Sequence, residues 1–130
     1  MKTYVQKLIG MAVLGLTLCS QSLPAWAGYA TQSEVTIATN SAYGSMAGAR
    51  YSTDSEQYIG CNFTHPSLGL IVNCSAQDKT GKSFTCWSNE TRFVNAAKAL
   101  TNYSYIYFNT APGSSSCGDL QVYNSSFYLK

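Results

Sequence analysis

Apolar and polar residues alternate through the middle of this chain, a pattern typical of β-strands that bury one face. The alternation predicts strands over about 57–64 and 70–77, separated by a turn at 65–69. The apolar side of these two strands carries Ile59, Cys61, Phe63, Leu70, Val72, Cys74 and Ala76. The pattern therefore predicts two half-buried strands, with cysteines on their buried side.

The next segment predicts a hairpin followed by a short helix. Lys79-Thr80-Gly81 fits a three-residue hairpin loop, and pairing across it places Cys86 directly opposite Cys74. After Ser88 or Asn89, either of which can cap a helix, apolar residues recur at helical spacing. These residues are Phe93, Ala96, Ala97 and Leu100. We expect one short helix here.

The two ends of the chain give different signals. Residues 103–110 form a β-prone run, and 120–129 predict one or two final strands. Residues 28–50 are rich in small side chains, with one candidate strand at 34–39, and we interpret the rest as an extended or mobile lead-in. The order of elements predicts a single α+β domain over 51–130. We expect a mainly antiparallel sheet of about five strands, with the helix packed on the face that carries the cysteines.

The N-terminal segment, residues 1–27, has the three parts of a secretory signal peptide. Two lysines give a positive start, residues 8–18 are apolar and uncharged, and Ala25-Trp26-Ala27 is a small–large–small cleavage signal. The apolar stretch is shorter than the roughly 20 residues of a membrane-spanning helix. We expect cleavage before Gly28, giving a bacterial protein that is periplasmic or secreted, without stable membrane insertion. A retained anchor and a lipoprotein acylated on Cys19 are the alternatives.

Cleavage would leave 103 of the 130 residues, with six Lys and Arg and six Asp and Glu. A net charge near zero provides no basic stripe for binding phosphates, so nucleic acid and anionic membranes are excluded as expected partners. The polar surface consists mainly of hydroxyl and amide side chains.

Four cysteines remain after cleavage, an even number that predicts two disulfides in an oxidising compartment. They are Cys61, Cys74, Cys86 and Cys117. Each disulfide would stabilise so small a domain by about 2–4 kcal/mol. The hairpin register favours Cys74–Cys86 with Cys61–Cys117, and Cys61–Cys74 with Cys86–Cys117 is nearly as good. The cysteines are too widely spaced for paired zinc ligands, so we expect no metal and no cofactor.

The residue pattern contains no evident catalytic group. His65 is the only histidine, and it lies at a turn beside Pro66. Asp78 and Asp119 flank loops, and Glu90 falls where a helix start favours negative charge. The sequence has no phosphate-binding glycine loop and no serine-nucleophile motif. We expect a protein that is not an enzyme, and a small secreted hydrolase with a carboxylate pair is the third choice.

Aromatic residues supply the candidate binding surface. With the helix on the cysteine face, the opposite face is expected to present Tyr58, Trp87, Tyr103, Tyr105, Tyr107 and Tyr123. Tyrosine and tryptophan combine flat apolar area with a polar tip, which suits sugars and protein partners. Two alternatives remain: the lead-in covers this face through Val35 and Ile37, or the uncharged run 103–108 self-associates.

The segment from Tyr58-Ile59-Gly60-Cys61 through 74–78 to Cys86 resembles small exported four-cysteine bacterial proteins of no assigned activity. This resemblance covers about the C-terminal two-thirds of the chain and implies no functional residue. Together the patterns predict a small exported non-enzymatic binding module that engages a glycan or a protein, for example as an inhibitor. The alternative is a structural subunit of a cell-surface or extracellular assembly.

Overall fold

The computed structural model describes residues 31–67 and 69–128, so the predicted signal peptide and its cleavage site lie outside the described residues. The described chain forms seven strands, two short helices and one 3-10 helix. In order they are β1 (Thr36–Ile37), β2 (Ser41–Ser45), α2 (Met46–Arg50), β3 (Tyr58–Thr64), β4 (Ile71–Gln77), β5 (Ser83–Ser88), α3 (Thr91–Lys98), β6 (Tyr105–Thr110), β7 (Cys117–Tyr123) and η1 (Ser126–Tyr128). Within these ranges, no helix is long and apolar enough to cross a membrane.

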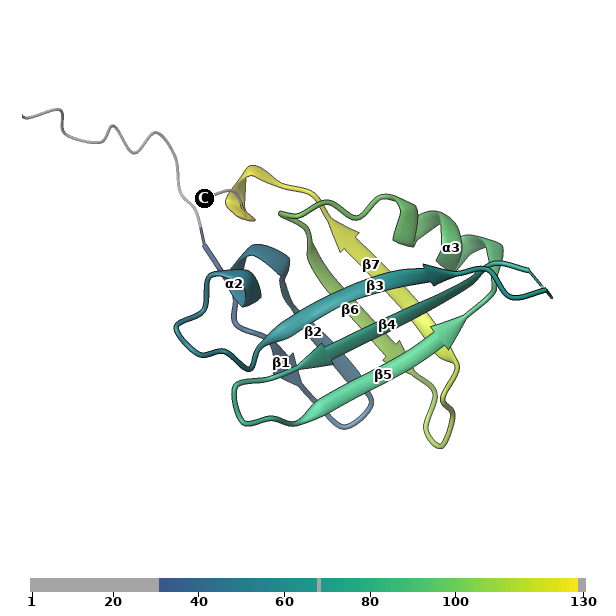
Figure 1. Cartoon of the computed structure of the whole chain (residues 1–130), viewed down its shortest axis with the longest axis horizontal. Helices are drawn as coiled ribbons and strands as arrows, with labels where there is room; N and C mark the ends of the chain where they lie inside the picture. The colour runs from purple at the N-terminus through teal and green to yellow at the C-terminus, as the bar shows by residue number, and fades with distance from the viewer. Residues whose placement is uncertain (1–30, 68, 129–130) are drawn as a thin grey trace, which may run out of the picture.

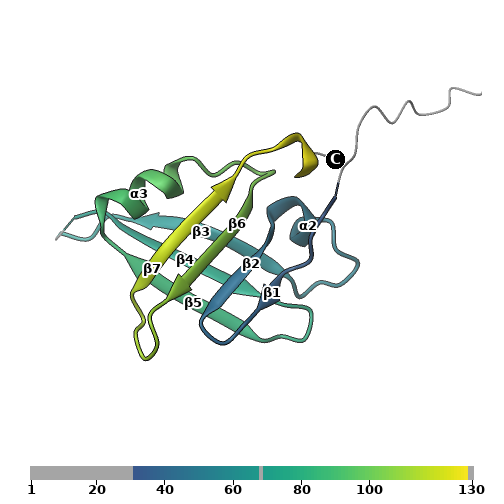
Figure 2. The same cartoon turned by 180° about the vertical axis from the view of Figure 1, so that it is seen from behind.

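The strands form two antiparallel sheets that face one another. Sheet A has the strand order β1-β2-β6-β7, and sheet B has the order β3-β4-β5. The strands of the two sheets cross, with α2 and α3 at opposite ends (Figures 1 and 2). Phe84 of β5 packs on Phe108 of β6, with ring centroids 5.7 Å apart. The predicted α+β class is confirmed, with the strands divided between two sheets.

The core fills the space between the sheets. Alternate strand positions point inward, because successive side chains of a strand face opposite sides. The buried apolar residues on the strands include Ala42, Ile59, Val72, Cys74, Ala76, Cys86, Ile106, Phe108 and Leu120. The predicted cysteine face belongs to the core at Cys74 and Cys86, and Cys61 is partly buried, but Phe63 of the same predicted face is 44% exposed. Sheet A, and not the helix, covers the buried part of this face. Helix α3 instead packs at one end, against β7 and β4, through Phe93, Val94 and Ala97.

Residues 28–50 were expected to form an extended or mobile lead-in, but the part that the structure describes, 31–50, is folded into the domain. They supply β1, β2 and α2, and β2 is a central strand of sheet A, paired with β6. Val35 and Ile37 are buried in the core. The small side chains of this segment allow close packing: a Cβ at Gly44 would lie 3.0 Å from the Glu34 carbonyl oxygen. The scarcity of large apolar residues in this segment therefore reflects close backbone packing. The sequence pattern did not reveal this packing.

The disulfides are Cys61–Cys74 and Cys86–Cys117, so the pairing favoured from the sequence is wrong. Cys74 does lie directly opposite Cys86, as the hairpin register predicted, but it also lies directly opposite Cys61. A bridge between Trp87 and Ser116 brings the start of β7 to β5, and Cys117, the first residue of β7, bonds to Cys86. This contact between the two sheets decides the pairing.

Two local details also differ from the sequence pattern. The N-cap of α3 is Glu90, which forms an ion pair with Arg92 (2.7 Å). Ser88 is buried, and its Oγ accepts a hydrogen bond from the Glu90 N–H (3.3 Å). The predicted final strand ends at Tyr123, after which the chain turns into η1.

Candidate ligand-binding site

The outer face of sheet A, turned toward the viewer in Figure 2, carries a group of tyrosines. Tyr105 and Tyr107 point outward because the residues that alternate with them point into the core. The strand register places Tyr43 of β2 beside Tyr107, and Tyr123 of β7 beside Tyr105. With one residue of η1, these make up what we call the tyrosine face: Tyr43, Tyr105, Tyr107, Tyr123 and Tyr128.

Ring contacts hold the tyrosine face together. Tyr128 stacks on Tyr105, with centroids 5.2 Å apart and an interplanar angle of 24°. Tyr123 meets Tyr105 edge to face, at 5.9 Å and 68°. Tyr43 and Tyr107 are also stacked, at 6.4 Å and 26°. These are favoured aromatic geometries, and they fix the directions in which the rings present their flat sides.

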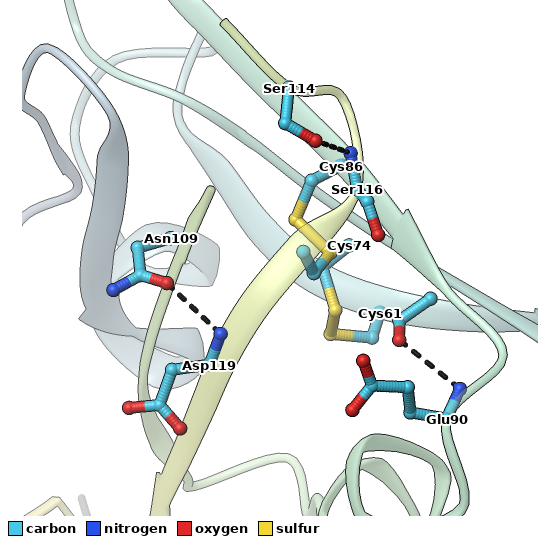
Figure 3. The surroundings of a disulfide bond; sticks show 10 residues. Cys61, Cys74, Cys86, Glu90, Asn109, Ser114, Ser116 and Asp119 are labelled. Carbon is cyan, nitrogen blue, oxygen red and sulfur yellow. Dashed lines mark hydrogen bonds between the residues drawn. A yellow bond between two sulfur atoms is a disulfide. The ribbon is translucent and has the colours of Figure 1, made fainter. Parts of the chain in front are cut away.

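A chain of polar contacts borders the rings. Tyr123 Oη donates to Gln121 Oε1 (2.6 Å), and Gln121 Nε2 donates to Asp119 Oδ2 (2.9 Å). The Asp119 N–H donates to Asn109 Oδ1 (3.0 Å), as Figure 3 shows. The Asn109 Nδ2 in turn donates to Tyr107 Oη (3.1 Å). Phenol, amide and carboxylate groups are thus held in fixed positions beside the flat aromatic surface.

An open cleft of about 430 Å³ lies among these rings. Its lining consists of Ser33, Tyr105, Tyr107, Gln121, Tyr123 and Tyr128, all uncharged side chains. Tyr123 is 48% exposed, while Tyr105 is half-buried. Burial raises the pKa of Tyr105, and the Tyr128 phenol adds a smaller increase. The Tyr105 phenol therefore stays protonated at neutral pH, where it can both donate and accept a hydrogen bond.

The structure brings together three of the six aromatic residues that the sequence assigned to one face. Tyr105, Tyr107 and Tyr123 lie on the tyrosine face. Trp87 and Tyr58 lie on sheet B, at positions that alternate with its buried residues. The expectation of one shared face is therefore wrong, because the strands belong to two sheets whose outer faces point in opposite directions.

Tyr103 precedes β6 and lies apart from the tyrosine face. It lines a different hollow together with Tyr58. Val35 and Ile37 do not cover the tyrosine face, since both are buried in the core between the sheets. The alternative in which the lead-in covers this face through Val35 and Ile37 is thus wrong, although Ser33 contributes to the edge of the cleft.

Sequence reasoning missed several members of the site. Tyr43 lies in the segment interpreted as a lead-in, although it stands between two small residues in an alternating pattern that could have indicated a strand. For Asp119, the sequence pattern predicts only an acid that flanks a loop. Tyr128 reaches the face because η1 folds back, and no periodic pattern signals such a turn.

The acidic residues outside the tyrosine face have structural partners. Asp54 accepts three hydrogen bonds from Glu56 and Gln57, and Asp78 accepts three within its hairpin loop. Glu34 forms an ion pair with Lys79 (2.8 Å). His65 is exposed in the loop between β3 and β4.

Among residues 31–67 and 69–128, no group of three or more His, Cys, Asp or Glu side chains is placed to hold a metal ion. The chain matches no protein-family model, no curated protein and no solved structure.

Proposed function

We propose that this protein is an exported, non-enzymatic binding module that holds a neutral glycan on its tyrosine face. The observation that carries the proposal is the cleft of about 430 Å³, whose lining within the described chain is entirely uncharged and which is bordered by ordered polar groups. Its volume falls within the range of small-ligand sites, which combine aromatic walls with a few fixed polar groups.

The chemistry of a sugar suits this surface. A pyranose ring has apolar C–H faces that pack on flat aromatic rings, and hydroxyl groups around its rim that hydrogen-bond to amides and carboxylates. Tyr105 and Tyr128 supply stacked rings, while Gln121 and Asp119 lie at their border. None of the described residues that line the cleft is a cation, so this part of the surface favours a neutral ligand over an anionic one.

The positions and hydrogen bonds of the carboxylates support a binding role over catalysis. Cleavage of glycosidic bonds ordinarily needs two carboxyl groups on either side of the bond. Among the described residues that form the tyrosine face and its border, Asp119 is the only acid. Asp54 and Asp78 are held by hydrogen bonds within their own loops.

The two disulfides suggest an oxidising location outside the cytoplasm, because such bonds persist there. We propose further that residues 1–27 direct export and are removed before Gly28, leaving the protein in the bacterial periplasm or medium. Intact mass of the protein recovered from outside the cytoplasm tests this. A mass that includes Met1, or lipid on Cys19, contradicts it.

Affinity electrophoresis tests the glycan proposal. The exported protein, with its disulfides intact, is run in native gels cast with soluble xylan, glucomannan, hydroxyethyl cellulose or starch. We expect at least one neutral polysaccharide to slow the protein, and the slowing to be relieved by the matching free oligosaccharide. No retardation by any of a broad panel of neutral polysaccharides, together with tight binding of a protein partner on the same face, contradicts the proposal.

A further inference from the structure

A second hollow, larger than the cleft of the tyrosine face, lies beside α2. Its volume is about 700 Å³, and it shares no lining residue with that cleft. The walls come from α2, the following loop, the start of β3 and the turn before β6. The lining residues used below are Met46, Ala47, Ala49, Arg50, Tyr58 and Tyr103.

The inner part of this α2 hollow is apolar. Ala47 and Ala49 are buried, and their small side chains leave the space that larger residues would fill. Ile59 is buried beside them, and the Met46 thioether is half-buried. Met46 is an adaptable side chain that can repack around different apolar shapes. This floor can therefore receive an apolar group of moderate size.

The rim of the α2 hollow is aromatic, and Arg50 is the cation that the described residues place there. Tyr58 and Tyr103 are 44% and 40% exposed. Arg50, in the last turn of α2, is exposed and forms no ion pair with any residue the structure describes. A guanidinium presents several N–H donors in a planar fork that matches the two oxygens of a carboxylate.

The acid that also lines the hollow is already engaged. Asp54 Oδ1 accepts from the N–H groups of Glu56 (3.0 Å) and Gln57 (2.9 Å), and its Oδ2 accepts from Gln57 Nε2 (2.6 Å). The Gln57 Oε1 accepts from the Val35 N–H (2.7 Å). Asp54 thus braces the loop against Val35, the residue that precedes β1, which leaves Arg50 as the charge available to a ligand.

We propose that the α2 hollow binds an organic carboxylate with an apolar body, such as an aryl- or alkyl-carboxylic acid. The carboxylate pairs with Arg50, and the apolar body packs on Ala47, Ala49 and Met46 between the tyrosine rings. This site is independent of the tyrosine face, so either proposal can stand when the other fails.

The test follows backbone amides by NMR in the ¹⁵N-labelled exported protein, with 3-phenylpropionate and octanoate as probes. We expect saturable shifts at Ala47, Ala49 and Tyr58, with no shifts at Tyr107 or Gln121. The neutral analogue 3-phenylpropanol should bind at least about tenfold more weakly, since it cannot form the charge-assisted contact.

The variant Arg50→Gln should weaken binding of 3-phenylpropionate by about tenfold or more. Lys98→Gln is the matched control, because Lys98 is also an exposed cation in the last turn of its helix, and it should leave binding unchanged. The comparison of acid with alcohol uses the unaltered protein, so it stands even if Arg50→Gln folds poorly.

Several results would overturn the proposal. One is the absence of shifts at the hollow with both acids at millimolar concentration. Another is equal affinity for the acid and the alcohol, which shows that Arg50 contributes nothing. Inorganic phosphate shifting the same amides as strongly as 3-phenylpropionate also overturns it, because the apolar floor would then play no part.

Discussion

Cys86 and Cys117 form a disulfide that joins β5, an edge strand of sheet B, to the first residue of β7, an edge strand of sheet A. Next to it, the Trp87 N–H donates to the Ser115 carbonyl oxygen (3.2 Å). The second disulfide, Cys61–Cys74, joins neighbouring strands within sheet B. The two bonds therefore constrain the fold differently, one between sheets and one within a sheet.

Removing the disulfide between the sheets should destabilise the protein more than removing the other. Cys86 and Cys117 are 31 residues apart in sequence, and Cys61 and Cys74 are 13 apart. Loop-closure entropy then gives about 3.7 kcal/mol for the first bond and about 2.9 kcal/mol for the second. Urea unfolding of the two double Cys→Ala variants measures this. Equal stability of the variants, or the reverse order, contradicts the prediction.

Gly48 in α2 should not tolerate a side chain, whereas Gly60 in β3 should. A Cβ at Gly48 would overlap the Ser33 carbonyl oxygen and the Ser45 Oγ that caps α2. At Gly60 the nearest atom would be Met46 Cε, 3.8 Å away. We expect Gly48→Ala to lower the free energy of unfolding by about 1–3 kcal/mol. Gly60→Ala serves as the matched control, and an equal loss in both variants contradicts the packing described for α2.

The Asp54 brace predicts a specific loss of stability in acid. The side-chain hydrogen bond from Gln57, followed by the backbone hydrogen bond from the same residue, lowers the pKa of Asp54 from its ordinary value of 3.8 to about 2. A carboxyl group with a lowered pKa stabilises the folded state above its unfolded pKa, and that stabilisation disappears as the pH falls through the folded value. The contribution should therefore be lost between about pH 4 and pH 2.

Melting temperature measured against pH tests the brace. Asp54→Asn should melt lower than the wild-type protein at neutral pH, and the difference should shrink between about pH 4 and pH 2. A constant difference across this range would show that the Asp54 charge does not support the loop.

Trp87 and Tyr105 should respond differently to truncation. Trp87 is 42% exposed on sheet B, so Trp87→Ala should change the melting temperature little. Tyr105 contacts Tyr123 and Tyr128 through its ring, and Tyr105→Ala should lower stability by about 1–2 kcal/mol. Calorimetry of both variants checks this, and a larger loss for Trp87→Ala contradicts the placement of these residues.

Sequence reasoning was most successful where contacts are local. The period-two pattern predicted β3 and β4, and the hairpin loop at Gly81, with its positive φ of 82°, set Cys74 opposite Cys86. It failed where a contact depends on residues far apart in the chain. Pairing of β2 with β6 and the bridge from Trp87 to Ser116 have no periodic signature.

In the candidate site, too, the sequence predicted the local features and missed the contacts between distant segments. The alternation of Tyr105 and Tyr107 with buried residues was visible in the sequence. Their neighbours Tyr43 and Tyr128 are each more than 20 residues away along the chain, and Tyr128 also lies beyond a turn. Only the folded structure places these side chains together.

The central claim is that the ligand binds on sheet A, at the tyrosine face. The most direct test compares Tyr123→Ala with Trp87→Ala in gels that contain the neutral polysaccharide that best retards the wild-type protein. Both residues are similarly exposed, at 48% and 42%, but they lie on different sheets. We expect Tyr123→Ala to weaken binding by about 1–3 kcal/mol, which is roughly 5- to 160-fold, and Trp87→Ala to leave it unchanged. Loss of binding in Trp87→Ala with full binding in Tyr123→Ala would contradict the account.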